Sequence, residues 1–133
     1  MIRSLKLIRL SLALVYGVSS THGATLTWTN LAGGAWTNSA NWSPNQVPAA
    51  ADQVVITNSS TYTVTLPANA SVNRLTIGGS TGIQTVLQSA GTFNPGNANI
   101  QLNGRLTLQD GSLGGVLLIE PGATFAAQTN PHT

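Results

Sequence analysis

After residue 23 the chain consists almost entirely of short β-type segments, and this succession most constrains its fold. The segment at 62–66 alternates strictly, so Tyr62, Val64 and Leu66 share one face of a strand. Comparable segments of three to six residues occur at 24–28, 54–57, 72–77, 83–87, 99–102, 105–108, 116–119 and 123–126. No window combines helical apolar spacing with helix-capping residues. The sequence therefore predicts an all-β fold.

Two architectures fit short strands at near-regular spacing, a β-sandwich and a parallel solenoid. The segments are shorter than the common strand length of about five to six residues. The stretches 103–111 and 115–122 resemble each other, each with a strand followed by a polar residue and a glycine, and 123–126 begins similarly. Medium-sized aliphatic residues suit stacking inside a narrow coil. We therefore predict a parallel β-helix of about four or five coils of roughly 20 residues, with the sandwich as the alternative.

The composition is consistent with such a stack. Only 6% of the 133 residues are charged, against about a quarter in ordinary globular domains. Thr, Asn, Ser and Gln must therefore solvate the surface, and like charges would repel each other in strands stacked about 4.8 Å apart. The chain has no cysteine, so backbone ladders and packing rather than disulfides must stabilise it.

The first 23 residues read as a secretory signal peptide. Residues 10–18 form a short apolar run, residues 19–23 are small or polar, and the basic residues before them are Arg3, Lys6 and Arg9. We expect cleavage after Gly23 and a secreted or cell-surface product. The apolar run is short for a bilayer span, so an uncleaved membrane anchor is the less favoured alternative.

Removal of residues 1–23 leaves Arg74 and Arg105 against Asp52, Asp110 and Glu120, a net charge of −1. The basic character of the whole chain therefore belongs to the leader. Nucleic-acid binding requires clustered Lys and Arg, so we expect no nucleic-acid partner and, after cleavage, no membrane span.

Three tryptophans precede the regular segments, at Trp28, Trp36 and Trp42. The open end of a solenoid exposes unpaired backbone groups and core, so repeat arrays need an atypical capping unit there. We assign residues 24–57 to an N-terminal Trp-rich cap with the first strands, and residues 58–133 to β-helix coils that we expect to be truncated. The C-terminal part has no comparable cap, which suggests a longer parent protein or end-to-end self-association.

Several motifs carry a family resemblance. They are Asn41-Trp42, Val47-Pro48, the D-x-V-V-I run from Asp52 to Ile56, Y-T-V-T-L from Tyr62 to Leu66, and L-T-I-G-G from Leu75 to Gly79. With these motifs the chain resembles the N-terminal region of large secreted bacterial proteins that contain autotransporter-associated β-strand repeats. The resemblance implies a right-handed parallel β-helix on or outside the cell, and it supplies no catalytic motif.

Few residues are candidates for catalysis. The histidines lie at His22, in the leader, and at His132, so no base accompanies the many hydroxyls. Asp110 and Glu120, with Arg105, are the candidates for a polysaccharide lyase or hydrolase site, which needs converging carboxyls. Each acid also precedes a glycine or Pro-Gly, as ordinary turn residues do, and we favour that interpretation.

Two binding hypotheses remain. Asp52 is a weak metal candidate, because calcium prefers several carboxylates, and a role in accepting backbone N–H bonds is favoured. Trp36 and Trp42 are candidates for stacking on sugar rings, although burial in the cap is favoured because each ring can bury about 150–250 Å².

We therefore predict a non-enzymatic, exported structural or adhesive module without a cofactor. Its partners would be polysaccharide or other cell-surface components, contacted weakly and repeatedly by Thr, Asn and Gln ladders. A carbohydrate-binding module that uses Trp36 and Trp42 is the first alternative, and a fragment of a polysaccharide lyase or hydrolase is the second.

Overall fold

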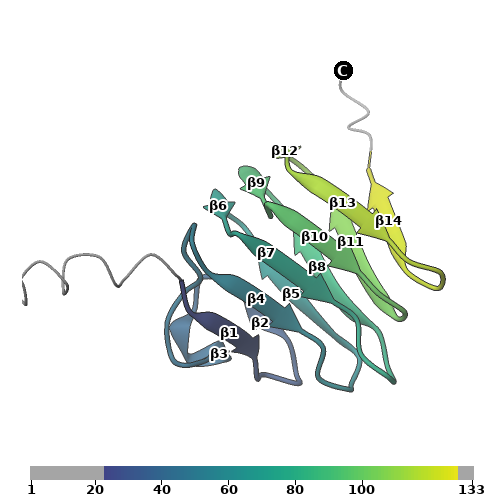
Figure 1. Ribbon diagram of the computed structural model, residues 1–133, viewed down its shortest axis with the longest axis horizontal. Coiled ribbons are helices and arrows are strands. Elements are labelled where there is room, and N and C mark those ends of the chain that lie inside the picture. The colour runs from purple at the N-terminus through teal and green to yellow at the C-terminus, as the bar shows by residue number, and fades with distance from the viewer. Residues whose placement is uncertain (1–22, 129–133) are drawn as a thin grey trace, which may run out of the picture.

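The computed structural model describes residues 23–128, so most of the predicted signal peptide lies outside the described residues. The described chain is all-β apart from one 3-10 turn, Ser39–Asn41. Its strands stack as successive coils of a β-solenoid, from purple at the N-terminal end to yellow at the C-terminal end (Figure 1). No helix among residues 23–128 is long and apolar enough to cross a membrane.

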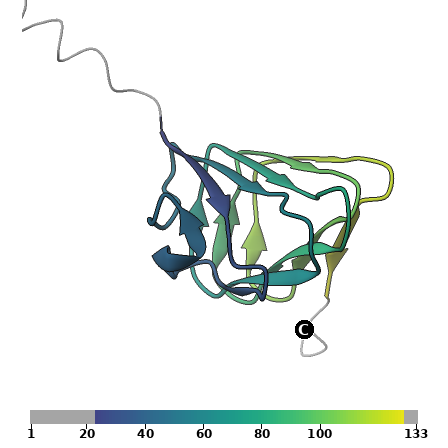
Figure 2. The ribbon, with the colours of Figure 1, turned by 90° about the horizontal axis from the view of Figure 1, so that it is seen from below.

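The coils contribute strands to three sheets, which form the sides of the solenoid. Sheet A contains, in order, β13 (Val116–Ile119), β10 (Asn97–Ile100), β7 (Arg74–Ile77), β4 (Gln53–Ile56), β1 (Thr25–Trp28) and β3 (Trp42–Ser43). Sheet B contains β14 (Thr124–Ala127), β11 (Gly104–Leu108), β8 (Gln84–Gln88), β5 (Tyr62–Leu66) and β2 (Gly34–Ala35). Sheet C contains β12 (Ser112–Leu113), β9 (Thr92–Asn94) and β6 (Ala70–Ser71). Figure 2, turned by 90°, shows the chain winding from one side to the next.

Strand pairing confirms the predicted solenoid. Every strand pair in the described residues is parallel except β1 with β3. In sheet A one column aligns Gln53, Arg74, Asn97 and Val116, so successive coils advance by 21, 23 and 19 residues. Two-sheet sandwiches of this size are built from antiparallel strands, so the β-sandwich alternative is not the fold.

The core is made of aligned apolar columns, because every second residue of a strand points inward. The inward columns include Leu26–Val54–Leu75–Ala98–Leu117 and Ile56–Ile77–Ile100–Ile119 in sheet A, Val64–Val86–Leu106–Phe125 in sheet B and Ala70–Phe93–Leu113 in sheet C. Most members are buried, Ala70 is partly buried, and in the last coil Leu117 and Leu113 are partly buried and Ile119 and Phe125 are exposed. The hydrophobic core thus runs along the axis and is open at one end.

The repeat unit differs from the one that the sequence suggested. The similar stretches 103–111 and 115–122 contain β11 and β13, which lie in sheets B and A of consecutive coils. They therefore lie on different sides of the solenoid, with β12 of sheet C between them, and are not equivalent parts of successive coils. The true repeat also includes a short strand in sheet C, which the sequence analysis did not identify.

Glycines allow the coils to turn at their corners. Gly91 and Gly111 precede the sheet C strands β9 and β12, with φ of 79° and 91°. A Cβ at Gly111 would clash with the carbonyl oxygen of Gly91 in the preceding coil. Both the left-handed backbone and the close stacking of the corners therefore require glycine at position 111.

Candidate functional site

The three tryptophans form the core of the N-terminal cap. Trp28 and Trp42 are fully buried and Trp36 is 1% exposed. The rings of Trp28 and Trp42 meet edge to face at 5.0 Å, and Trp36 meets Trp42 at 5.1 Å. The rings of Trp36 and Phe93, which lies in sheet C, also meet edge to face at 5.4 Å. Such edge-to-face packing is a favourable aromatic geometry.

Hydrogen bonds fix the cap around these rings. The indole N–H of Trp42 donates to the backbone oxygen of Trp36 at 2.8 Å, and that of Trp28 donates to the oxygen of Asn30 at 2.6 Å. The buried Asn41 side chain donates to the oxygen of Ala35 at 2.9 Å. The burial agrees with the cap interpretation of Trp36 and Trp42, and neither ring presents a face on which a sugar can stack.

Strand β3 closes the exposed edge of sheet A. It pairs antiparallel with β1, through Thr27–Ser43 and Trp28–Trp42. It has only two residues, and Pro44 follows it directly, with Pro48 nearby. Proline has no backbone N–H and short strands offer few ladder groups, so this edge is protected against further pairing.

Asp52 serves the backbone, as the sequence analysis favoured. It is 5% exposed, and its carboxylate accepts from the backbone N–H of Ala24 at 2.8 Å and of Ala49 at 2.8 Å. The second bond closes the turn between the Val47-Pro48 loop and β4. Within residues 23–128, no group of three or more potential metal-ligating side chains surrounds it.

The structure does not bring the candidate catalytic residues together. Glu120 follows β13 and donates its backbone N–H to Ile100, which places it at the corner between sheets A and B. Asp110 follows β11, at the opposite corner between sheets B and C. A five-residue strand spans about 17 Å, whereas the two carboxyls of a glycosidase lie within about 10 Å. Arg105 is on the outer face of sheet B, in a column with Thr85 and Thr124. The three residues therefore form no common site.

Threonine, serine and asparagine cover much of the outer surface, as expected. One outer column of sheet B reads Thr63–Thr85–Arg105–Thr124. Hydroxyls from neighbouring coils contact each other at the corners, where Ser112 donates to Thr92 at 3.1 Å and Ser59 lies 3.0 Å from Ser80. These ladders make a polar surface with little charge.

The outer face of sheet A changes character in the last coil. Its two outer columns read Gln53–Arg74–Asn97–Val116 and Val55–Thr76–Asn99–Leu118. A shallow groove of about 310 Å³ runs over the C-terminal part of these columns. It is lined mainly by polar residues of β7 and β10 and by Val116 and Leu118 of β13. Val116 is 65% exposed and Leu118 is 59% exposed. The polar surface thus becomes apolar at the C-terminal end.

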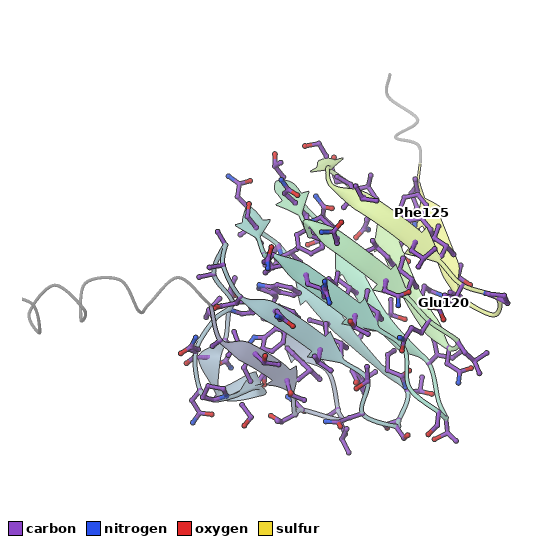
Figure 3. The ribbon with its side chains drawn as sticks, viewed as in Figure 1. Glu120 and Phe125 are labelled. Atoms are coloured by element: carbon purple, nitrogen blue, oxygen red, sulfur yellow. The ribbon has the colours of Figure 1, made fainter. Side chains whose placement is uncertain are left out.

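The inward side of the last coil is exposed as well. Ile119 is 46% exposed and Phe125 is 38% exposed, although the residues aligned with them in the preceding coils are fully buried. Figure 3 labels Phe125 and Glu120 on this last coil. The backbone N–H groups of Val116 and Glu120 donate to carbonyl oxygens of the preceding coil. In a strand, the N–H groups of alternate residues point to opposite edges. The N–H groups of Leu117 and Ile119 therefore face the open edge.

The sequence analysis missed two features. The first is a pair of inward glutamines, Gln84 and Gln88, which are fully buried and bond to corner carbonyls of two coils each. No sequence signal distinguishes them from surface glutamines. The second is the apolar end, and here a signal existed. The run V-L-L-I at Val116–Ile119 is continuous rather than alternating, which is typical of a strand buried on both faces.

Burial also affects the one tyrosine of the core. Desolvation raises the pKa of Tyr62 to about 12 from 10.0, and the backbone of Asn58 partly opposes this shift. The Tyr62 hydroxyl, beneath the Trp28 ring, makes no hydrogen bond of standard geometry within the described residues. Tyr62 is therefore a neutral core residue and not a candidate base.

Comparison with protein-family models, with curated proteins and with solved structures gave no match.

Proposed function

We propose that the protein is a non-enzymatic structural or adhesive module of the cell surface, which starts a longer β-solenoid. The polar, weakly charged ladders supply its outer surface, and the Trp-rich cap seals its N-terminal end. One observation carries the proposal, namely that the last described coil is apolar on both faces and that no strand within residues 23–128 pairs with the outer edge of β13. In the internal strands β7 and β10 the inward residues are buried and both edges are paired with neighbouring coils, so the exposed inward side of β13 is the part that a further coil would cover.

The natural occupant of this end is a further coil of the same chain. An additional strand beside β13 would pair the N–H groups of Leu117 and Ile119 and cover the core side of Ile119. Repeat arrays gain stability from each such interface between neighbours. A second copy of the protein is the competing occupant, and it is the alternative outcome of the test below.

An added coil tests the end directly. Residue 127 aligns with residue 108, so a copy of residues 110–128 inserted after Gln128 continues the register. We expect hydrogen exchange at Leu117 and Ile119 to slow by roughly tenfold or more, because frayed edge amides become paired. The control carries the same insertion with aspartate at the four positions copied from Val116–Ile119.

Equal exchange in the extended protein and its control would contradict the role of β13 as an internal strand. Slow exchange already in the unextended protein, together with a dimeric mass by light scattering, would instead identify a second copy as the occupant.

The adhesive part of the proposal predicts avidity without strong single-site affinity. Beads that display many copies should be retained on cell-surface polysaccharide, while the same protein in solution should bind too weakly to compete at comparable concentration. Release of reducing ends from the polysaccharide, lost on Glu120→Gln substitution, would favour the hydrolase alternative. Tight binding by the monomer, with a shift of its tryptophan fluorescence, would favour the carbohydrate-binding alternative.

A further inference from the structure

A buried carboxylate lies at the point where the described fold begins. Asp52 is 5% exposed, and one carboxylate oxygen accepts the backbone N–H of Ala24 at 2.8 Å. The other oxygen accepts the backbone N–H of Ala49 at 2.8 Å. Both donors are neutral amides, so residues 23–128 give the buried negative charge hydrogen bonds but no positive partner. Buried carboxylates are most stable when a cation and hydrogen bonds both compensate them.

The fold holds Ala24 through both its backbone and its side chain. Its N–H is bound by Asp52, its carbonyl oxygen accepts from the backbone N–H of Gln53 at 2.8 Å, and its side chain packs on the core. Strand β1 begins at the next residue. Gly23 is exposed and lies so close to Ala51 that an added Cβ would clash with the carbonyl oxygen of that residue.

Strand β1 therefore begins one residue after the bond at which the sequence predicts cleavage. Signal peptidases require small residues before the scissile bond, and Gly23 meets this requirement. The leader boundary and the carboxylate are independent observations, since one comes from the amino-acid pattern and the other from the packing of β1 on β4.

We propose that signal peptidase cleaves the Gly23–Ala24 bond and that Asp52 is the receptor for the new N-terminal ammonium group of Ala24. This inference rests on the export included in the proposed function. Hydrolysis consumes one water, breaks the peptide C–N bond, and leaves a carboxylate on Gly23 and an ammonium on Ala24. The neutral N–H to Asp52 bond then becomes a charge-assisted one, which is shorter and roughly twice as strong.

The composition of the chain makes this group easy to observe. Residues 24–133 contain no lysine, so the amine of Ala24 is the only primary amine of the processed protein. An amine-acylating reagent therefore reports on this single group, and each modified molecule gains one acyl group by mass.

The experiment starts from the full 133-residue chain, expressed with its leader in an exporting bacterial host. N-terminal sequencing and intact mass of the exported protein should give Ala24 as the first residue. Acylation by N-hydroxysuccinimide acetate should be roughly tenfold slower in the folded protein than in guanidinium, as expected when an opposite charge within about 4–6 Å favours the protonated amine. Asp52→Asn should abolish most of this protection.

The matched control is Asp110→Asn, since Asp110 is exposed and, within the described residues, its carboxylate accepts only the N–H of its neighbour Gly111. It should leave the acylation rate unchanged. If Asp52→Asn does not fold, the comparison of folded and denatured wild-type protein still decides.

A first residue other than Ala24, equal acylation rates in the folded and denatured protein, or equal effects of the two substitutions would each overturn the inference. An exported protein that is cut elsewhere refutes only this inference and leaves the surface module standing. A chain that is not exported at all refutes the proposed location as well.

Discussion

Replacement of Gln84 by methionine tests whether the buried glutamines hold the corners of the solenoid together. The Gln84 amide accepts from the N–H of Gly79 at 2.6 Å and donates to the carbonyl oxygens of Ser60 at 2.6 Å and Thr81 at 2.9 Å. Ser60 belongs to the preceding coil, and Thr81 belongs to the same coil as Gln84. One side chain therefore links the corners of two neighbouring coils, which are not joined there by strand pairing.

The expected loss of stability follows from these contacts. Methionine keeps nearly the same volume, so the substitution removes three hydrogen bonds without creating a large cavity. At a net value of about 1 kcal/mol each, the free energy of unfolding should fall by about 3 kcal/mol. For a domain of this size, that corresponds to a decrease of the melting temperature by roughly 10 °C.

Thermal and guanidinium unfolding, followed by far-UV circular dichroism and by tryptophan fluorescence, measures the change. Gln53→Met is the control, because Gln53 has the same chemistry but is exposed on the outer face of β4. Its effect should stay within about 0.5 kcal/mol, as for ordinary surface substitutions. Equal effects of the two substitutions would refute the idea that Gln84 anchors the corner.

Three further predictions address the corners, the tyrosine and the cap. Gly111→Ala should destabilise the protein by about 1 kcal/mol or more, whereas Gly114→Ala, with its nearest contact at 3.8 Å, should be close to neutral in the same denaturation assay. Because the folded protein retains the Tyr62 proton to a pKa of about 12 while an unfolded tyrosine releases it near 10.0, stability should decrease as the pH rises from about 10 to about 12. Tyr62→Phe should remove this dependence, and an unchanged pH profile of the variant would contradict the assignment to Tyr62. Acrylamide should quench the fluorescence of the native protein poorly, because the three tryptophans are buried, and added polysaccharide should not shift the emission; efficient quenching would show that the cap is open in solution.

The sequence predicted the strands of sheets A and B well. Tyr62–Leu66 and Val116–Ile119 have the predicted bounds, and most other strands differ by one or two residues. Period-two alternation or a continuous apolar run is strong in these segments, because their inward residues fill a core. Parallel stacking also followed from composition, since a nearly uncharged polar surface suits strands in register.

The short strands were not predictable in the same way. Strands β2, β3, β6 and β12 have two residues each, too few for any alternation to appear. Sheet C was therefore missed, although Phe93 is one of its core residues. The antiparallel return of β3 depends on contacts between Trp28 and Trp42, which lie 14 positions apart in the sequence, and no local pattern encodes such pairing.

Among the candidate site residues, the local interpretations were the reliable ones. Asp52 accepts neighbouring N–H groups, and Asp110 bonds to the N–H of Gly111, as their turn context suggested. Whether Asp110 and Glu120 converge could be judged only by knowing the corner at which each acid lies. That depends on coil length, which a degenerate repeat does not reveal.

The inequality of the two ends restricts the symmetry of any assembly. A head-to-tail contact would require the capped end to accept a parallel strand, but β3 runs antiparallel and is followed by Pro44. In sheet A, two copies of the unit can instead join by bringing the two apolar coils face to face, with β13 and its symmetry mate antiparallel across a two-fold axis. Such an isologous contact uses the same surface on both partners and closes at two subunits. The cap thus disfavours end-to-end growth into a filament through sheet A and favours a closed pair.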